Sequence, residues 1–276
     1  MQKNKPFVSV LMPAYNAEKY IGLAIQSILD QTYRDFEFII LDDCSKDHTW
    51  EIIQKYAQKD KRIRAIHNNI NLKIAETLNK GLKECKGKYI VRMDADDWSY
   101  PNRIEKQVEF MEKNPEISVS GGSTLVCNEK MKPICIRHYL ITDEEIKESI
   151  LRLNPIAHPA SIWRKEFLFK TRLYPHIIGA EDYALIVELS SFSKLGNIED
   201  VLIKFRVHSK SASNSAIVKQ QKASLYVSDM AVYEYGYIPT FKDHLWRFVQ
   251  KISMYTIPPK VKRFLLTRLI INRSPK

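Results

Sequence analysis

The sequence contains little glycine, and none of it forms a glycine-rich phosphate-binding loop. Its 276 residues include 8 glycines, and Gly121-Gly122 is the only adjacent pair. Neither the Gly-x-x-x-x-Gly-Lys-Ser/Thr loop nor the Gly-x-Gly-x-x-Gly turn is present. Kinase-like, GTPase-like and dehydrogenase-like classes therefore lose support, and any phosphate group that this chain binds must be held in another way.

Cysteines and long apolar runs are also scarce. The cysteines Cys44, Cys85, Cys127 and Cys135 form no Cys-x-x-Cys pair, which indicates scattered reduced thiols and not a zinc site or a disulfide framework. No run approaches the ~18 apolar residues of a membrane span, and the polar N-terminal residues do not resemble a secretory signal. These features predict a cytoplasmic protein.

Acidic residues are missing from the C-terminal end. The chain has 43 Lys+Arg against 32 Asp+Glu, a net charge of +11, yet no Asp or Glu follows Asp243. Residues 244–276 instead mix cations with large apolar side chains. The cations are Arg247, Lys251, Lys260, Lys262, Arg263, Arg268, Arg273 and Lys276, and the apolar residues include Trp246, Phe248 and Phe264. This composition is typical of an amphipathic helix on an anionic membrane. Nucleic-acid binding and a solvated helix packed on the rest of the protein are the alternatives, and the interleaved apolar residues favour the membrane.

Strand-like and helix-like segments alternate along the N-terminal part. Apolar runs predict strands at 7–12, 36–41, 64–66 and 88–93, and helical spacing predicts helices at 18–29, 47–57 and 74–85. Further on we expect helices at 101–111, 143–153 and 181–192, a short helix at 167–168, strands at 117–126, 134–140 and 201–207, and helix from 217 onward. This alternation predicts an α/β fold with a mostly parallel central sheet flanked by helices, followed by a C-terminal helical extension.

The most informative stretch is Arg92-Met93-Asp94-Ala95-Asp96-Asp97, which follows the apolar segment 88–91. Aspartates are common in turns because they accept local backbone hydrogen bonds, so an isolated Asp-x-Asp pair would carry little weight. Here the acids stand at the carboxyl end of a strand, where open α/β sheets bind ligands. Carboxylates this close repel one another unless a cation neutralises them, and a hard divalent cation with open positions can also hold phosphates. The run therefore suggests a metal–diphosphate site for a nucleotide-activated substrate.

Four segments in order resemble the successive signatures of glycosyltransferase family 2. They are Val8–Asn16, Ile40–Ser45, Asp94–Asp97 and Gly179–Tyr183, and the resemblance covers roughly residues 6–210. It implies the GT-A fold, a single α/β domain around a nucleotide-sugar site, and transfer with inversion. We therefore expect a GT-A catalytic domain over residues 1–212 and a basic, membrane-associating helical extension over residues 213–276.

The resemblance also implies roles for residues of the donor site. Pro13 would shape the loop after the first strand, and the Tyr15 ring would stack on the base. Asp43 would accept the uracil N3–H and so select uridine. Asp94 and Asp96 would form the metal site, with Asp96 as the direct ligand of Mn²⁺ or Mg²⁺ and Asp94 nearer the ribose or donor sugar.

The segment Gly179–Tyr183 implies the catalytic base. Asp182 would take the proton from the acceptor hydroxyl group while that oxygen attacks the anomeric carbon. The simpler explanation is that acids favour helix N-termini. His208, like Arg206, matches a position where a basic group approaches the metal or the diphosphate, whereas a structural role explains His158 equally well.

Together, the residues and the resemblance predict an inverting, metal-dependent glycosyltransferase that moves a hexose or N-acetylhexosamine from a UDP-sugar to a hydroxyl group of a saccharide. A polyprenyl-diphosphate-linked acceptor in bacterial O-antigen (lipopolysaccharide) or capsule biosynthesis, used at the cytoplasmic face of the inner membrane, fits the basic extension. The alternatives are a soluble or protein acceptor, or a metal-dependent nucleotidyltransferase, which would not need Asp182 as a base. No nucleic-acid partner is expected.

Overall fold

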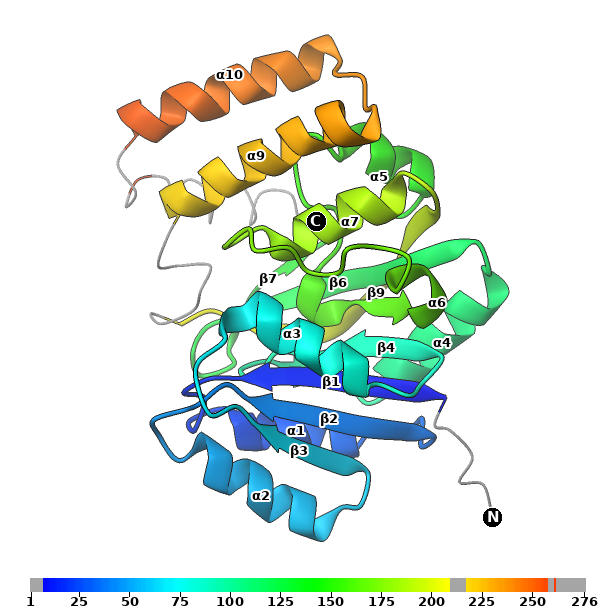
Figure 1. The fold of residues 1–276 in the computed structure, drawn as a ribbon, viewed down its shortest axis with the longest axis vertical. Coiled ribbons are helices and arrows are strands. Elements are labelled where there is room, and N and C mark those ends of the chain that lie inside the picture. Colours follow the sequence, from blue (N-terminus) through cyan, green and yellow to red (C-terminus); the bar gives the residue numbers. More distant parts are fainter. Residues whose placement is uncertain (1–6, 209–216, 258–260, 262–276) are drawn as a thin grey trace.

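The structure is a computed structural model that describes residues 7–208, 217–257 and 261. Helices cover a nine-stranded mixed sheet (Figure 1). The N-terminal half alternates strand and helix, as predicted. Its elements are β1 (Val8–Ala14), α1 (Ile21–Leu29), β2 (Phe36–Asp42), α2 (Thr49–Lys59), β3 (Ile63–His67), α3 (Lys73–Glu84) and β4 (Tyr89–Arg92). β1 pairs in parallel with β2 and β4, and β2 pairs in parallel with β3, which confirms the parallel part of the predicted sheet.

The segment from residue 98 to residue 206 adds both parallel and antiparallel strands to the sheet. Its elements are β5 (Trp98–Ser99), α4 (Arg103–Lys113), β6 (Ile117–Cys127), β7 (Pro133–Arg137), α5 (Asp143–Ser149), the 3-10 helix η1 (His158–Ala160), β8 (Ile162–Arg164), α6 (Lys165–Leu168), α7 (Glu181–Ser190) and β9 (Lys194–Arg206). The strand order is β3-β2-β1-β4-β8-β6-β9-β5, with β7 paired to β6. β8 lies antiparallel to both of its neighbours, while β6 and β9 are parallel.

Three short elements, β5, η1 and β8, have no counterpart in the sequence-based expectations. Each spans two or three residues, too few to show a hydrophobic period. β9 begins at Lys194 and not at residue 201, because its first half pairs with β6 through several register shifts. These differences arise from strand pairing over long sequence separations, which local periodicity does not report.

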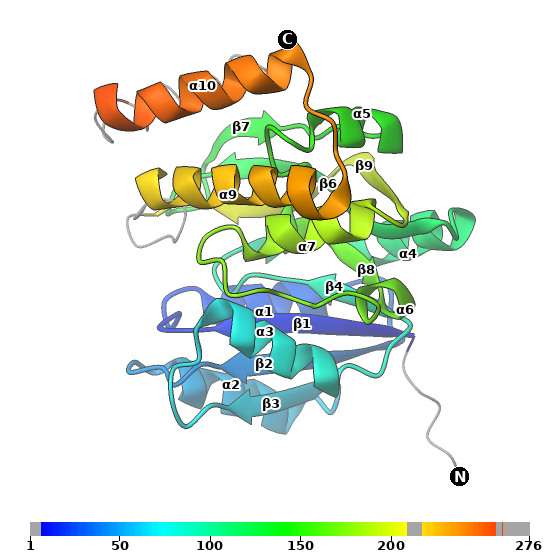
Figure 2. The same cartoon turned by 45° about the horizontal axis from the view of Figure 1, so that its top comes forward.

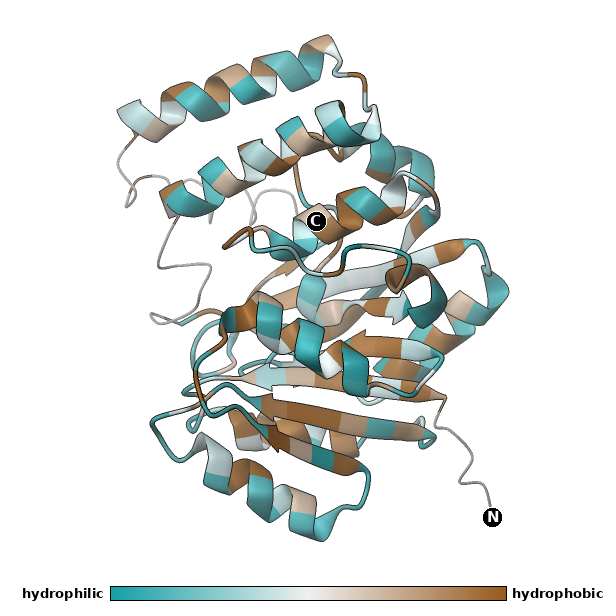
Figure 3. Ribbon diagram, viewed as in Figure 1, coloured by the Kyte–Doolittle hydropathy of each residue, from teal (hydrophilic) through white to brown (hydrophobic). Residues whose placement is uncertain are grey.

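Two apolar layers enclose the sheet. Val10 and Met12 of β1 face a cluster with α1, α2 and α4, whereas Leu11 faces a cluster with α3, α5 and α7. Because both faces are covered, β1 is buried along its whole length, and its sequence is apolar except for Ser9. Figure 3 shows the strands as mostly hydrophobic and the outer helices as mixed.

Two further helices, α9 (Ile217–Tyr235) and α10 (Phe241–Thr256), confirm the predicted C-terminal helical extension. α9 contributes Val227, Met230 and Ala231 to the core cluster that contains α7. α10 lies on the outer side of α9 in both orientations (Figures 1 and 2). Within the described residues, no helix combines the length and the apolar character needed to cross a bilayer. Residues 258–260 and 262–276 of the predicted membrane-binding segment lie outside the described residues.

Candidate active site

A hollow of about 600 Å³ lies where β1 and β4 end at their carboxyl termini. It brings together five of the predicted site residues, Pro13, Tyr15, Asp94, Asp96 and His208. The remaining wall comes from the loops after β1, β2 and β4 and from the β6–β7 turn. It consists of Asn16, Ala17, Glu18, Lys19, Tyr20, Asp47, Ala95 and Glu129. Asp43 and Asp182, the other two predicted site residues, do not line this hollow.

Three carboxylates meet beside the hollow. Ligand atoms of Asp94, Asp96 and Asp97 all lie within 4.8 Å of one another. Arg92 donates to Asp94 Oδ1 at 2.6 Å, and the backbone N–H of Arg206 donates to Asp97 Oδ1 at 2.8 Å. Asp97 is 1% exposed and lies behind the wall, so Asp94 and Asp96 are the acids of the cluster that face the hollow.

The charges of this cluster are only partly compensated. Burial raises the pKa of Asp96, and the neighbouring Asp94 raises it further. Burial also raises the pKa of Asp97 well above its usual range, with a further contribution from Asp96. In addition, Asp97 Oδ2 is buried without a hydrogen-bond partner. Three hard oxygen donors with an uncompensated buried oxygen fit a divalent cation such as Mn²⁺ or Mg²⁺.

His208 reaches the cluster from beyond the end of β9. Its Nε2 pairs with Asp96 Oδ2 at 2.8 Å, across a sequence separation of 112 residues. The Tyr20 ring lies 5.0 Å from the His208 ring and 4.5 Å from the guanidinium carbon of Arg206. Tyr20 also donates its hydroxyl to Glu129 at 2.9 Å. The aromatic ring therefore connects the loop after β1 with the end of β9 and the β6–β7 turn.

Two loops form the side of the hollow that carries Tyr15, which is 49% exposed. Asn16 adopts a positive φ of 49° and accepts a hydrogen bond from Lys46 N at 2.8 Å. Its own N–H donates to Ser45 Oγ at 2.9 Å. Cys44 has φ 61°, a left-handed conformation that costs an L-residue about 1–2 kcal/mol. The loop after β1 is thereby fixed against the loop after β2.

Asp43 is buried at the end of β2, and both of its carboxylate oxygens have protein partners. Oδ1 accepts from Leu72 N at 2.8 Å and from the Asn68 side chain at 2.9 Å. Oδ2 accepts from Lys73 N at 2.9 Å, at the N-terminus of α3. Asp43 therefore fixes the loop before α3, a structural task that its position after β2 did not reveal.

Asp182 lies in the first turn of α7, a helix that follows Gly179 in a left-handed conformation (φ 88°). Asn154 donates to Asp182 Oδ2 at 2.8 Å. Burial raises the pKa of Asp182 to about 6, and the adjacent Glu181 adds to the shift. A carboxyl group with this pKa can hold and release a proton near neutral pH.

The comparison with known proteins identifies the family. The profile of Glycosyl transferase family 2 matches residues 9–171. The chain belongs to glycosyltransferase family 2. It is 37% identical over 225 residues to an uncharacterized glycosyltransferase of Haemophilus influenzae, covering 77% of this chain and 69% of that protein. It is 32% identical over 226 residues to the O-antigen biosynthesis glycosyltransferase WbnJ of Escherichia coli, covering 79% of this chain and 86% of WbnJ.

Solved structures share the fold of this glycosyltransferase. S. aureus TarS 1-349 in complex with UDP-GlcNAc superposes with a TM-score of 0.71 at 18% identity, covering 92% of this chain and 74% of that one. The mannosyltransferase PcManGT from Pyrobaculum calidifontis, in complex with GDP-Man and Mn²⁺, gives 0.63 at 14% identity, covering 97% of this chain and 86% of that one. The predicted GT-A fold and the predicted enzyme class are confirmed.

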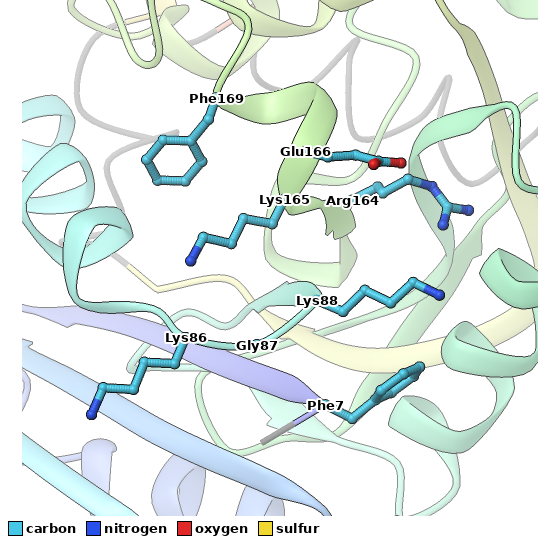
Figure 4. A pocket seen from close by; sticks show the side chains of 8 residues that line it. All are labelled: Phe7, Lys86, Gly87, Lys88, Arg164, Lys165, Glu166 and Phe169. Carbon is cyan, nitrogen blue, oxygen red and sulfur yellow. The ribbon is translucent and has the colours of Figure 1, made fainter. Parts of the chain in front are cut away.

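A second hollow of about 580 Å³ lies at the opposite edge of the sheet of the glycosyltransferase, beside the N-terminal ends of β1 and β4. Figure 4 shows its aromatic and basic lining. The lining residues are Phe7, Lys86, Gly87, Lys88, Arg164, Lys165, Glu166 and Phe169. Glu166 is the sole carboxylate among them, so this hollow lacks the acid cluster that marks the other.

Tyr20 and Glu129 were missed by the sequence analysis, and Arg92 was noted there only as the first residue of the acidic run, without a role. Arg92 stands two residues before Asp94, and a buried cation beside clustered acids was the available signal. Glu129 forms an ion pair with Lys19 across 110 residues, and no local pattern marks such a contact. His158 is half-buried with Nε2 2.9 Å from the Tyr174 hydroxyl, and desolvation lowers its pKa well below the usual value, which favours the structural interpretation.

Proposed function

We propose that this glycosyltransferase moves a hexose or N-acetylhexosamine from a UDP-sugar to a saccharide hydroxyl group with inversion at the anomeric carbon. The observation that carries the proposal is that the carboxylates of Asp94 and Asp96 face the hollow. The Nε2 atom of His208 lies within hydrogen-bond distance of Asp96. Such a constellation suits a diphosphate whose charge a divalent cation balances. It fits a nucleotidyltransferase less well, because that class needs no base at the position of Asp182.

The donor base would lie between the loops after β1 and β2. Tyr15 offers an exposed ring there, and stacking on a base contributes about 1–3 kcal/mol. Pro13 forms the adjoining wall. Asp43 already holds the loop before α3. Its carboxylate would also accept a hydrogen bond from the uracil N3–H. The bound UDP-GlcNAc of TarS, a protein of the same fold, supports a uridine donor.

Asp94 and Asp96 would hold Mn²⁺ or Mg²⁺, and the Mn²⁺ bound to PcManGT supports this assignment. When bound, the cation neutralises the negative charge that develops on the departing diphosphate. His208 keeps Asp96 oriented, and Arg92 does the same for Asp94. Asp97 anchors the turn to β9 through Arg206 N.

Asp182 would act as the general base. It takes the proton of the acceptor hydroxyl as that oxygen bonds to the anomeric carbon and the bond to the diphosphate oxygen breaks. One displacement step inverts the anomeric configuration and leaves no sugar on the enzyme. Asn154 orients the carboxylate, and the pKa of about 6 keeps it deprotonated at neutral pH.

The acceptor would be a saccharide on a polyprenyl diphosphate, used for O-antigen or capsule assembly at the cytoplasmic face of the inner membrane. WbnJ is an O-antigen biosynthesis glycosyltransferase, which supports a surface polysaccharide product. The cations of residues 244–276 would hold the protein on the anionic membrane surface. Residues 1–212 would form the catalytic domain, and residues 213–276 would form the membrane-associating extension.

The test is a donor screen. Purified protein is incubated with Mn²⁺ and UDP-Glc, UDP-Gal, UDP-GlcNAc, UDP-GalNAc or GDP-Man, and nucleotide release is measured. UDP binding is measured by calorimetry with Mn²⁺ and with EDTA. We expect release from one UDP-sugar and weak UDP binding after chelation. Release from GDP-Man alone would refute the uridine assignment, and UDP affinity unchanged by EDTA would refute the metal assignment.

A further inference from the structure

The outer face of α10 is apolar and exposed. Its large side chains follow one another at intervals of four and three residues, which places them on one side of a helix. We call Phe241, Leu245, Phe248, Ile252 and Tyr255 the outer stripe of α10. Their exposed fractions are 81%, 52%, 61%, 45% and 85%. Figure 3 shows hydrophobic residues recurring along this outermost helix.

The inner face of α10 is bonded to the protein through polar side chains, and the half-buried Trp246 and Met254 lie on the same side. Arg247 donates to Ser228 Oγ of α9 at 3.0 Å and also pairs with Asp229. Gln221 of α9 donates to Gln250 at 2.7 Å. Asp243 is the buried residue of this helix and pairs with Arg152. Soluble proteins usually bury the larger apolar side of such a helix, whereas α10 leaves its outer stripe exposed.

This orientation is held firmly at the start of the helix. Thr240 forms a capping box with Asp243, in which each side chain bonds the backbone of the other residue. The Asp243 carboxylate therefore joins the cap to Arg152, outside the extension. A rotation of α10 that buried the outer stripe would break the Asp243–Arg152 pair and the bonds to α9. The apolar exposure is thus built into the fold.

Cations flank the outer stripe on both sides. Successive helical residues are about 100° apart, so Lys242 borders one side of the stripe and Lys251 the other. Both are exposed, and Lys242 also faces Glu148 at 3.9 Å. Lysines beside an apolar face can extend their ammonium groups toward lipid headgroups while large side chains enter the acyl boundary.

We propose that the outer stripe of α10 is the surface that docks on an anionic lipid bilayer. Charge complementarity favours this occupant, because no Asp or Glu follows Asp243 in the sequence and Lys251 is exposed beside the stripe, while Arg247 is already paired with Asp229. A second copy of the chain would bring identical cations together across a two-fold interface, which is unfavourable. A nucleic acid would engage the cations but leave the apolar side chains in water. The proposal deepens the membrane part of the proposed function by naming the contact surface, and it does not depend on the chemistry of Asp182.

The test compares two leucines of similar exposure on different helices. Leu245→Ser removes part of the stripe, and Leu23→Ser, at 57% exposure on α1, is the matched control. Full-length proteins are sedimented with vesicles of phosphatidylcholine, with or without phosphatidylglycerol. We expect wild type and Leu23→Ser to bind the anionic vesicles, and Leu245→Ser and Phe248→Ser to bind about tenfold more weakly, in line with the loss of a buried apolar side chain. Lys251→Glu should lower binding about fivefold or more.

An equal thermal unfolding temperature in all variants would show that the loss of vesicle binding is not caused by misfolding. Equal UDP–Mn²⁺ affinity would show that it is not caused by damage to the donor site. Vesicle binding unchanged in both Leu245→Ser and Phe248→Ser would overturn the proposal. So would a wild-type dimer in sedimentation velocity that Leu245→Ser dissociates without a change in vesicle binding. Equal binding to vesicles with and without phosphatidylglycerol would refute the anionic specificity.

Discussion

The hollow beside Asp94 and Asp96 and the hollow beside Lys86 and Lys165 lie at opposite ends of the same strands. Their volumes are nearly equal, about 600 and 580 Å³. At the first, acids lie close to one another and one buried oxygen has no partner. At the second, Lys165 donates to the Cys85 carbonyl at 2.6 Å and Lys88 pairs with Glu112.

The difference teaches that the volume of a hollow does not distinguish the candidate active site of this protein. The distinguishing feature is uncompensated charge at the carboxyl ends of parallel strands, because ligands of open α/β sheets bind at those strand ends. At the N-terminal ends of the strands, the Arg164 side chain donates to the backbone carbonyls of Ile117 and Met111 at 3.1 and 2.6 Å. These hydrogen bonds give Arg164 a structural role. The following predictions test this contrast, from the largest expected effect to the smallest.

Asp182→Asn should remove most of the transferase activity while leaving UDP binding intact. A general base contributes about 10²–10⁴-fold, so we expect turnover to fall by about a thousandfold. Steady-state transfer rates and calorimetric UDP affinity measure the two effects separately. Asp200→Asn, a change at an exposed acid paired with Lys106, is the control. Near-normal turnover in Asp182→Asn would place the base elsewhere.

Asp96→Asn should weaken both Mn²⁺-dependent UDP binding and transfer. Removing one electrostatic contact to the reacting group costs about 10²–10³-fold, and we expect about a hundredfold loss of kcat/KM. Titration of Mn²⁺ at fixed UDP gives the change in metal affinity. A variant with wild-type Mn²⁺ dependence would show that the cluster does not hold the cation.

The pH dependence of turnover should report Asp182. The base acts when deprotonated, and its pKa is raised to about 6, so kcat should fall below pH 6 by about tenfold per pH unit. An ordinary carboxyl pKa would delay this fall to about pH 4. Because Asp96 belongs to the metal cluster, UDP–Mn²⁺ binding must be measured at each pH. If kcat and UDP–Mn²⁺ binding fall over the same pH range, the fall in kcat does not report the protonation of Asp182.

Tyr20→Leu should reduce Mn²⁺ affinity about fivefold. The ring contacts both Arg206 and His208, and a cation–π contact contributes about 0.5–2 kcal/mol to the position of such groups. Tyr20→Phe keeps the ring and loses the bond to Glu129, so it should retain most of the affinity. If Tyr20→Phe and Tyr20→Leu behave alike, the hydroxyl group and not the ring orients His208.

Lys86→Met, in the opposite hollow, should change transfer and UDP affinity by about twofold or less. Exposed side chains away from a site usually contribute within about 0.5 kcal/mol. The same assays used for Asp96→Asn measure the effect. A tenfold loss would mean that the N-terminal edge of the sheet takes part in binding, and the contrast between the two hollows would fail.

Much of the fold followed from sequence because its signals are local. The strands at 7–12 and 36–41 and the helix at 74–85 were expected within one or two residues of their observed bounds. Asp94 and Asp96 were found because the acids directly follow a strand. Asp43 was expected at the donor, yet its immediate partners are the backbone of α3 and Asn68, since a buried carboxylate must satisfy its oxygens nearby.

The sequence alone determined that acids stand at the end of a parallel strand and that the C-terminal end is basic, because both facts depend on neighbouring residues. The tertiary structure decided that His208 meets Asp96 and that Glu129 meets Tyr20, at separations of 112 and 109 residues. It also decided that α10 leaves its outer stripe exposed, through the bonds of Asp243 and Arg247. These contacts are set by strand register and helix packing across the whole chain, and for that reason no local pattern encodes them.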